Sequence, residues 1–132
     1  MVCDAANEAA LATLRQRKHR PGKAFAVMVA STEEARALCE VNDAEARQLA
    51  SPARPIVLLR KRSDATFAKG LADNLPELGV MLPTTPVQHL LLHECGGMLV
   101  MTSGNIHDEP IVIDEETAFS QLAGVADAFL VN

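Results

Sequence analysis

The sequence predicts a single α/β domain with a largely parallel or mixed open sheet flanked by helices. Short apolar runs of strand length alternate with segments that begin in helix-capping residues. The chain has 132 residues, 48% of them apolar, which is enough for one hydrophobic core and too little for two. Trp and Tyr are absent and Phe is rare, so an aliphatic core is expected and base stacking is a poor basis for function.

The N-terminal part predicts one helix and one strand. Asp4 or Asn7 can cap a helix that runs to about Lys18 and is stopped by Pro21-Gly22. Residues 24–29 form a continuous apolar run, which is typical of a strand covered on both faces.

Two short helices and a second strand follow. Ser31 with Glu34 forms a capping-box pair, and Asn42 with Glu45 nearly forms another. Residues 55–59 are apolar and bounded by proline, so they predict a strand.

A polar stretch separates this strand from the next pair of elements. Residues 61–78 are interrupted by glycine and proline and predict a loop. Residues 79–83 predict a short strand, and Pro86 opens a Leu-rich helix that reaches about Cys95 before Gly96-Gly97 stops it.

The C-terminal part predicts two strands around a helix. Residues 98–102 form a strand that ends in the small polar turn at residues 103–105. A helix from Asp114 to about Leu122 and a last strand at residues 128–131 complete the pattern.

The positive charge is concentrated in one place. The net charge of −5 argues against a general nucleic-acid or anionic-membrane binder, because those proteins present a broad basic field. Five cations nevertheless occur within nine residues, and nothing acidic lies near them in sequence to relieve their repulsion. They could cap a helix C-terminus or bind an anion. We call them the basic cluster: Arg15, Arg17, Lys18, Arg20 and Lys23.

The turn at residues 103–105, Ser-Gly-Asn, is the second candidate feature. In open α/β sheets, ligands bind beyond the carboxyl ends of strands, and Ser103 and Asn105 offer hydrogen-bond donors and acceptors there. The same residues could form an ordinary side-chain turn. With the basic cluster they indicate a phosphate-bearing small molecule, and Asp108 and Glu109 could hold Mg²⁺ beside its phosphates.

Metal and thiol chemistry have weaker signals. His89 and His93 share a helix face, but with no third ligand suitably spaced we expect no structural metal. Cys3, Cys39 and Cys95 form no CxxC pair, which indicates free thiols, mostly buried, and a reducing compartment.

No apolar run has membrane-spanning length, so a cytoplasmic protein is expected. No nucleophile–base pair can be assigned, and the catalytic residues stay unknown.

Several segments, in order, carry a resemblance to a known family. Together they resemble the YrdC-like domain of the hydrogenase maturation carbamoyltransferases, HypF, over essentially the whole chain. The segments are Val2-Cys3-Asp4-Ala5, Leu14-Arg15-Gln16-Arg17-Lys18-His19-Arg20-Pro21, Ser51-Pro52-Ala53-Arg54-Pro55-Ile56-Val57-Leu58-Leu59, Gly79-Val80-Met81-Leu82-Pro83-Thr84-Thr85-Pro86 and Leu99-Val100-Met101-Thr102-Ser103-Gly104-Asn105.

The resemblance implies a twisted YrdC-like sheet with a positively charged, ATP-binding cavity. In HypF-like proteins this domain joins a carbamoyl group, derived from carbamoyl phosphate, to ATP and releases pyrophosphate. The carbamoyl group of the resulting carbamoyl adenylate then passes to the partner protein HypE. Lys18 and Arg20 match the family's Lys-x-Arg pair, and Ser103 and Asn105 match its Ser-x-Asn pair, so with Lys23 they are expected to line the nucleotide site.

Two alternatives stay open at this stage. The YrdC-like fold is also associated with double-stranded RNA, whose backbone the basic cluster could contact. Segments that family members have at both ends are missing from residues 1–132, so the single domain is expected to be incomplete at both termini, and it could be an inactive remnant. Exposed sheet edges would also allow self-association.

Overall fold

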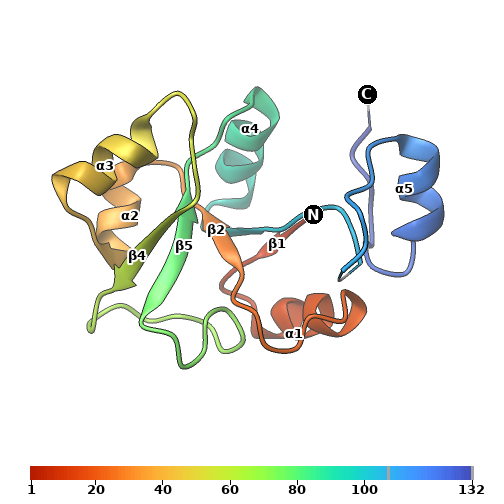
Figure 1. Ribbon diagram of the computed structural model, residues 1–132, viewed down its shortest axis with the longest axis horizontal. Coiled ribbons are helices and arrows are strands. Elements are labelled where there is room, and N and C mark those ends of the chain that lie inside the picture. The colour runs from red at the N-terminus through yellow and green to blue at the C-terminus, as the bar shows by residue number, and fades with distance from the viewer. Residues whose placement is uncertain (107, 132) are drawn as a thin grey trace.

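A computed structural model describes residues 1–106 and 108–131. In this part of the chain six strands and five helices alternate, except that the fifth strand follows the fourth without a helix between them (Figure 1). The strands are β1 (Val2–Asp4), β2 (Ala26–Met28), β3 (Cys39–Glu40), β4 (Val57–Lys61), β5 (Glu77–Met81) and β6 (Leu99–Met101). The helices are α1 (Glu8–Arg17), α2 (Thr32–Leu38), α3 (Asp43–Ala50), α4 (Pro86–Cys95) and α5 (Glu115–Gln121).

The strands form one open mixed sheet in the order β1-β6-β2-β5-β4-β3. Within the described residues only β2 and β5 pair in parallel, so the mixed form of the predicted sheet is the one observed. β6 lies between β1 and β2 and is antiparallel to both. The carboxyl end of β6, at Met101, therefore lies beside Ala26 at the amino end of β2.

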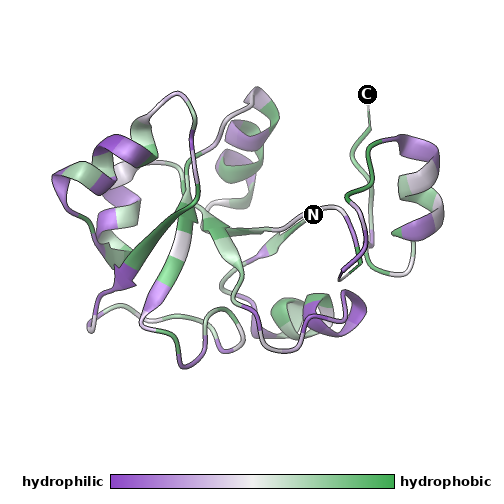
Figure 2. Ribbon diagram, viewed as in Figure 1, coloured by the Kyte–Doolittle hydropathy of each residue, from purple (hydrophilic) through white to green (hydrophobic). Residues whose placement is uncertain are grey.

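The two faces of the sheet are covered by different helices. Val27 and Val100 belong to the main core, to which α1, α2 and α3 contribute buried side chains. Met28 follows Val27 in β2, and Leu99 precedes Val100 in β6, so both side chains point to the opposite face. There they pack with Leu92 of α4. Figure 2 agrees with this arrangement. The strands are largely hydrophobic, whereas the helices carry both hydrophilic and hydrophobic residues.

The helices begin at residues that the capping patterns predict. Asn7, not Asp4, caps α1 by accepting a hydrogen bond from the Ala10 amide, while Thr85 caps α4. The box at Asn42 and Glu45 is complete, because each side chain accepts from the other residue's backbone amide. These bonds satisfy amides that the first turn of a helix leaves unpaired.

Some strand boundaries differ from the sequence-based prediction. β4 begins two residues later than residues 55–59, and β5 begins two residues earlier than residues 79–83. Tertiary pairing sets these limits, because Leu59 and Leu78 face each other in the ladder and are both fully buried. β3 was not predicted, since its two residues form a strand only by pairing with β4.

The predicted strand at residues 128–131 is wrong. These residues form no strand, and Phe129 instead packs edge-on against Phe119 of α5, with 5.0 Å between ring centroids. An apolar run becomes a strand only where a sheet edge receives it, and here the run follows α5, which stands apart from the sheet (Figure 1).

The cysteines differ from one another in their surroundings. Cys39 is buried at the junction of α2 and β3, and burial raises its pKa to about 11. Cys3 is half-buried, and burial likewise raises its pKa to about 11. Cys95 is exposed at the end of α4, so the expectation of mostly buried thiols is wrong for this residue.

The predicted loop at residues 61–78 is confirmed for residues 62–76, which contain no helix or strand, while its ends lie in β4 and β5. Leu71 and Ala72 in this loop are buried, and the Leu71 carbonyl accepts a hydrogen bond from the Phe25 amide at 3.1 Å. Among the described residues, no helix combines the length and hydropathy needed to cross a membrane.

We expect Leu59→Ala to lower the free energy of unfolding by about 2–5 kcal/mol, because it leaves a cavity in the main core. The matched control is Leu58→Ala on the same strand, where the side chain is 65% exposed and the loss should be within about 0.5 kcal/mol. Urea denaturation measures both. An equal decrease in the free energy of unfolding for the two variants would contradict the finding that Leu59 points into the core and Leu58 points to solvent.

Candidate functional site

The candidate site forms where the end of β6 meets the connection from α1 to β2. Because β6 is antiparallel to β2, the turn at residues 103–105 emerges beside the start of β2. The same connection carries Lys18, the C-cap of α1. Sheet topology thus brings together two segments that are more than eighty residues apart in sequence.

Lys18 is the central contact between these segments. Its ammonium donates hydrogen bonds to the Ser103 carbonyl at 2.7 Å, the Asn105 carbonyl at 2.6 Å and Asn105 Oδ1 at 2.9 Å. A lysine ammonium has three N–H donors, and all three are used here. The side chain is only 1% exposed, and no other polar or charged residue in the described chain is classed as buried.

The turn is further fixed by its own side chains. Ser103 Oγ donates to Asn105 Oδ1 at 2.6 Å, and Asn105 Nδ2 donates to the Glu109 carbonyl at 2.6 Å. The amide oxygen of Asn105 therefore receives two donors, while its nitrogen faces the following loop. This arrangement fixes the orientation of the amide.

The ammonium lies in an electrostatic environment that disfavours its charge. Burial lowers the pKa of Lys18 below the ordinary lysine value, and the positive charge of Arg20 lowers it further. The carbonyl and amide oxygens of the turn compensate for this, because the negative ends of their dipoles face the ammonium.

Arg20 is held differently from Lys18. Its Nη2 donates to the Ala24 carbonyl at 3.0 Å, and its guanidinium carbon lies 5.6 Å from the centroid of the Phe25 ring. Its Nε is buried and has no hydrogen-bond partner among the described residues. Arg20 therefore retains hydrogen-bonding capacity that the protein itself does not use.

Arg15 organises the loop that carries Arg20 and Lys23. Its guanidinium lies 4.4 Å from the centroid of the Phe25 ring and donates to the carbonyls of Arg20 at 2.9 Å and Lys23 at 2.8 Å. It also donates to the Gly70 carbonyl through Nε at 2.8 Å and Nη2 at 2.5 Å. Sequence reasoning placed Arg15 in the basic cluster but could not identify this role, because its carbonyl partners have no residue-type signal.

The remaining cations of the basic cluster point elsewhere. Arg17 pairs with Asp127 at 2.7 Å and donates to the Val125 carbonyl at 3.2 Å, which ties α1 to the C-terminal segment. The Lys23 side chain is exposed. The structure thus joins Lys18, Ser103 and Asn105 by direct hydrogen bonds, and it places Arg20 near enough to lower the pKa of Lys18.

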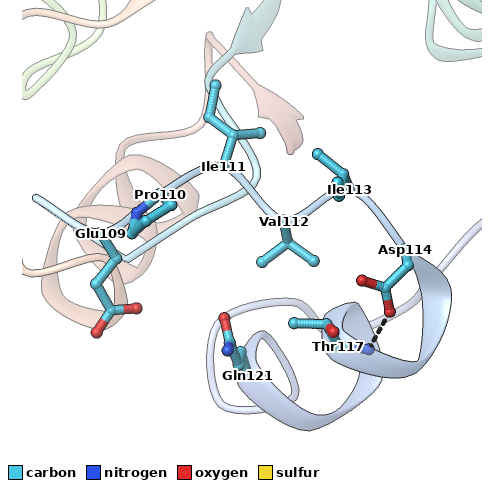
Figure 3. Close-up of a pocket in the computed structure, with 8 residues that line it drawn as sticks. All are labelled: Glu109, Pro110, Ile111, Val112, Ile113, Asp114, Thr117 and Gln121. Carbon is cyan, nitrogen blue, oxygen red and sulfur yellow. Dashed lines mark hydrogen bonds between the residues drawn. The ribbon is translucent and has the colours of Figure 1, made fainter.

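The loop after the turn borders an open pocket of about 310 Å³ (Figure 3). Residues 109–114 form one wall, and Thr117 and Gln121 of α5 form the other. Asp114 accepts a hydrogen bond from the Thr117 amide and so caps α5. Glu109 lines this pocket with an exposed carboxylate.

His89 and His93 line another pocket, of about 460 Å³, together with Glu34. The Glu34 carboxylate accepts a hydrogen bond from the Ala30 amide at 2.8 Å. Within the described part of the chain, no three His, Cys, Asp or Glu side chains are grouped so that they could hold a metal ion.

The fold and the site define an α/β domain in which a mixed sheet carries a polar turn held by a buried lysine. A sequence model of the Sua5/YciO/YrdC family, described as "Telomere recombination", matches residues 1–132. The chain belongs to this family.

Individual relatives narrow the similarity to one group within the family. The chain is 47% identical to carbamoyltransferase HypF2 of Cupriavidus necator, with all of this chain and 18% of that protein covered. A crystal structure of full-length HypF in its phosphate- and nucleotide-bound form matches with a TM-score of 0.96 and 49% identity, covering 99% of this chain and 21% of that one. Sua5 of P. abyssi in complex with L-threonine shares the fold, with a TM-score of 0.80 at 20% identity, covering 96% of this chain and 38% of that one. The chain thus spans about a fifth of the HypF proteins it matches.

We expect Arg15→Lys to lower the free energy of unfolding by about 2–3 kcal/mol, because an ammonium cannot reach the same set of carbonyls. Arg17→Lys is the matched control, since its pair with the largely exposed Asp127 should be worth less than about 1 kcal/mol. Urea denaturation of both variants provides the measurement. Equal stability of Arg15→Lys and the wild type would show that the carbonyl contacts of Arg15 do not hold this loop.

We also expect the purified chain to carry no stoichiometric zinc, because His89 and His93 supply two ligands where a closed site needs four. Elemental analysis of the purified protein tests this. Zinc at one equivalent that disappears in a His89→Ala variant would refute the prediction.

Proposed function

We propose that the chain is the nucleotide-binding part of a HypF-type carbamoyltransferase that forms carbamoyl adenylate. The observation that carries the proposal is the contact of Lys18 with Ser103 and Asn105, because these are residues that the family resemblance assigns to a nucleotide site. Support also comes from the match, along the whole chain, to HypF carbamoyltransferases.

In the proposed reaction, water cleaves carbamoyl phosphate to carbamate and inorganic phosphate, a carbamate oxygen then attacks the α-phosphorus of ATP, and pyrophosphate leaves. Negative charge then develops on phosphate oxygens, which fixed cations and hydrogen-bond donors stabilise. Arg20 supplies an Nε–H that has no hydrogen-bond partner among the described residues, and Lys23 supplies an exposed ammonium in the same loop. Ser103 and Asn105 orient the nucleotide or the acyl group. In the whole protein, the carbamoyl group would pass to HypE for hydrogenase maturation.

Mg²⁺ accompanies ATP in this proposal as part of the substrate. Asp108 and Glu109 fit it by donor type, since Mg²⁺ takes one or two carboxylates together with phosphate oxygens. The backbone of Glu109 adjoins the turn through its bond from Asn105. We assign Asp108 and Glu109 no other part in the reaction.

The internal contacts of the basic cluster favour this function over RNA binding. Arg15, Arg17 and Lys18 donate to backbone carbonyls, and Arg17 also pairs with a carboxylate. A duplex-binding surface depends on many cations free to contact phosphates. A small anionic ligand needs only a few, which suits Arg20 and Lys23.

The test is carbamoyl-phosphate-dependent exchange of pyrophosphate into ATP. It is run with the 132-residue chain and with Cupriavidus necator HypF2 in which this chain replaces the corresponding segment. We expect the chimera to catalyse exchange and the 132-residue chain alone to catalyse none at an appreciable rate. Arg20→Ala within the chimera should slow exchange about 100-fold, as for loss of a charge-stabilising donor. Arg47→Ala on α3 is the control, because Arg47 is exposed on a helix that packs on β4, and it should leave exchange unchanged.

Three results would count against the proposal. A folded chimera without exchange, beside an active unmodified HypF2, would identify the chain as an inactive remnant. Equal rates for Arg20→Ala and Arg47→Ala would remove Arg20 from the site. RNA binding that weakens with salt, in the absence of exchange, would favour the RNA alternative.

A further inference from the structure

The ammonium of Lys18 has no hydrogen-bonding capacity left for a ligand. Its three donors are directed at Ser103 O, Asn105 O and Asn105 Oδ1, all between 2.6 and 2.9 Å. Its side chain is almost fully buried. Contact with a phosphate would require it to break at least one of these bonds and to leave a buried acceptor unpaired, which is costly.

We propose that Lys18 is a positioning residue, which acts on the substrate only through the turn at residues 103–105 and the orientation of Asn105. Arg20, two residues further on, is then the member of the Lys-x-Arg pair that meets the phosphates. This inference rests on the proposed function, and it gives the two cations of the pair different tasks.

The contacts of Asn105 explain why positioning needs a cation. Oδ1 of Asn105 accepts from both Lys18 and Ser103, so rotating the amide would direct its NH₂ group at an ammonium and a hydroxyl. Lys18 thereby holds Nδ2 on the Glu109 carbonyl and leaves the Ser103 side chain exposed at the turn. Without Lys18, two backbone carbonyls and one amide oxygen lose their shared donor.

Nuclear magnetic resonance of the ¹⁵N-labelled 132-residue chain, without ligand, tests the positioning itself. In the wild type one of the two Nδ2 protons of Asn105 should be shifted away from the position typical of an exposed asparagine amide, since it is bound to the Glu109 carbonyl. Lys18→Met should move both signals toward the exposed-amide positions, whereas Lys69→Met, the same substitution at an exposed lysine, should leave them unchanged. Unaltered Asn105 signals in a folded Lys18→Met variant would overturn the proposal.

Titration of the wild-type chain with ATP tests which cation meets the ligand and needs no substitution at a buried site. We expect the Arg20 Nε signal to shift and the Lys18 ammonium signal to stay in place. A shift of the Lys18 ammonium as large as that of Arg20 would show direct contact and would refute the proposal. If neither signal responds, the 132-residue chain alone does not bind ATP. Exchange by the chimera then decides the proposed function, while the Asn105 signals still decide whether Lys18 positions the turn.

Exchange kinetics in the chimera separate positioning from a purely structural role. Lys18→Met and Asn105→Ala should each lower kcat about 100-fold, as small misplacements do, with little change in the KM for ATP. Because Lys18 acts through Asn105, the two losses should not multiply. The kcat of the double variant should lie within about threefold of the kcat of the slower single variant. Multiplied effects, or a rise in KM with Lys18→Met alone, would indicate an independent contact with ATP. If Lys18→Met does not fold, Asn105→Ala still distinguishes the two roles, because it should lower kcat while the Lys18 ammonium stays on its backbone acceptors.

Discussion

The buried ammonium of Lys18 is the interaction on which the arrangement of the site depends. A charge removed from water costs several kcal/mol unless fixed dipoles compensate it. The compensating dipoles belong to one turn, so the helix that carries Lys18 and the strand that precedes the turn cannot shift independently. The same constraint fixes the Asn105 amide and leaves Arg20 as the neighbouring cation with an unpaired donor, its Nε–H, among the described residues.

In the basic cluster, the number of positive charges does not indicate how many of them are available at the surface. Arg15 serves as a structural clamp on carbonyls and on the Phe25 ring, and Arg17 serves as a tie to the C-terminal segment. Five neighbouring cations are tolerated because Arg15, Arg17 and Lys18 donate to oxygen atoms of the protein, although burial and the charge of Arg20 still lower the pKa of Arg15 and of Lys18. A strongly basic segment can therefore hold a loop in shape and present only a small positive area to a ligand.

Much of the fold could be predicted from sequence, because capping residues and apolar runs are local signals. Asn7, Ser31 and Asn42 cap helices as their residue types predict. β3 and the irregular segment at residues 128–131 could not be predicted, since a strand exists only where another strand pairs with it. For the site, chemical type indicated which residues to group, but the antiparallel placement of β6 beside β2, which brings them together, has no local signal.

The position of β6 also determines when the site can form. The ribosome makes Lys18 long before residues 103–105 exist, and their contacts span 85 and 87 residues of sequence. Until β6 arrives, β1 lacks its partner in the sheet, β2 lacks one neighbour, and the Lys18 ammonium stays hydrated. Such distant contacts form slowly and leave strand edges open in the meantime. Closure of the sheet and assembly of the site are thus one late folding event, so a nascent chain that ends before β6 has neither.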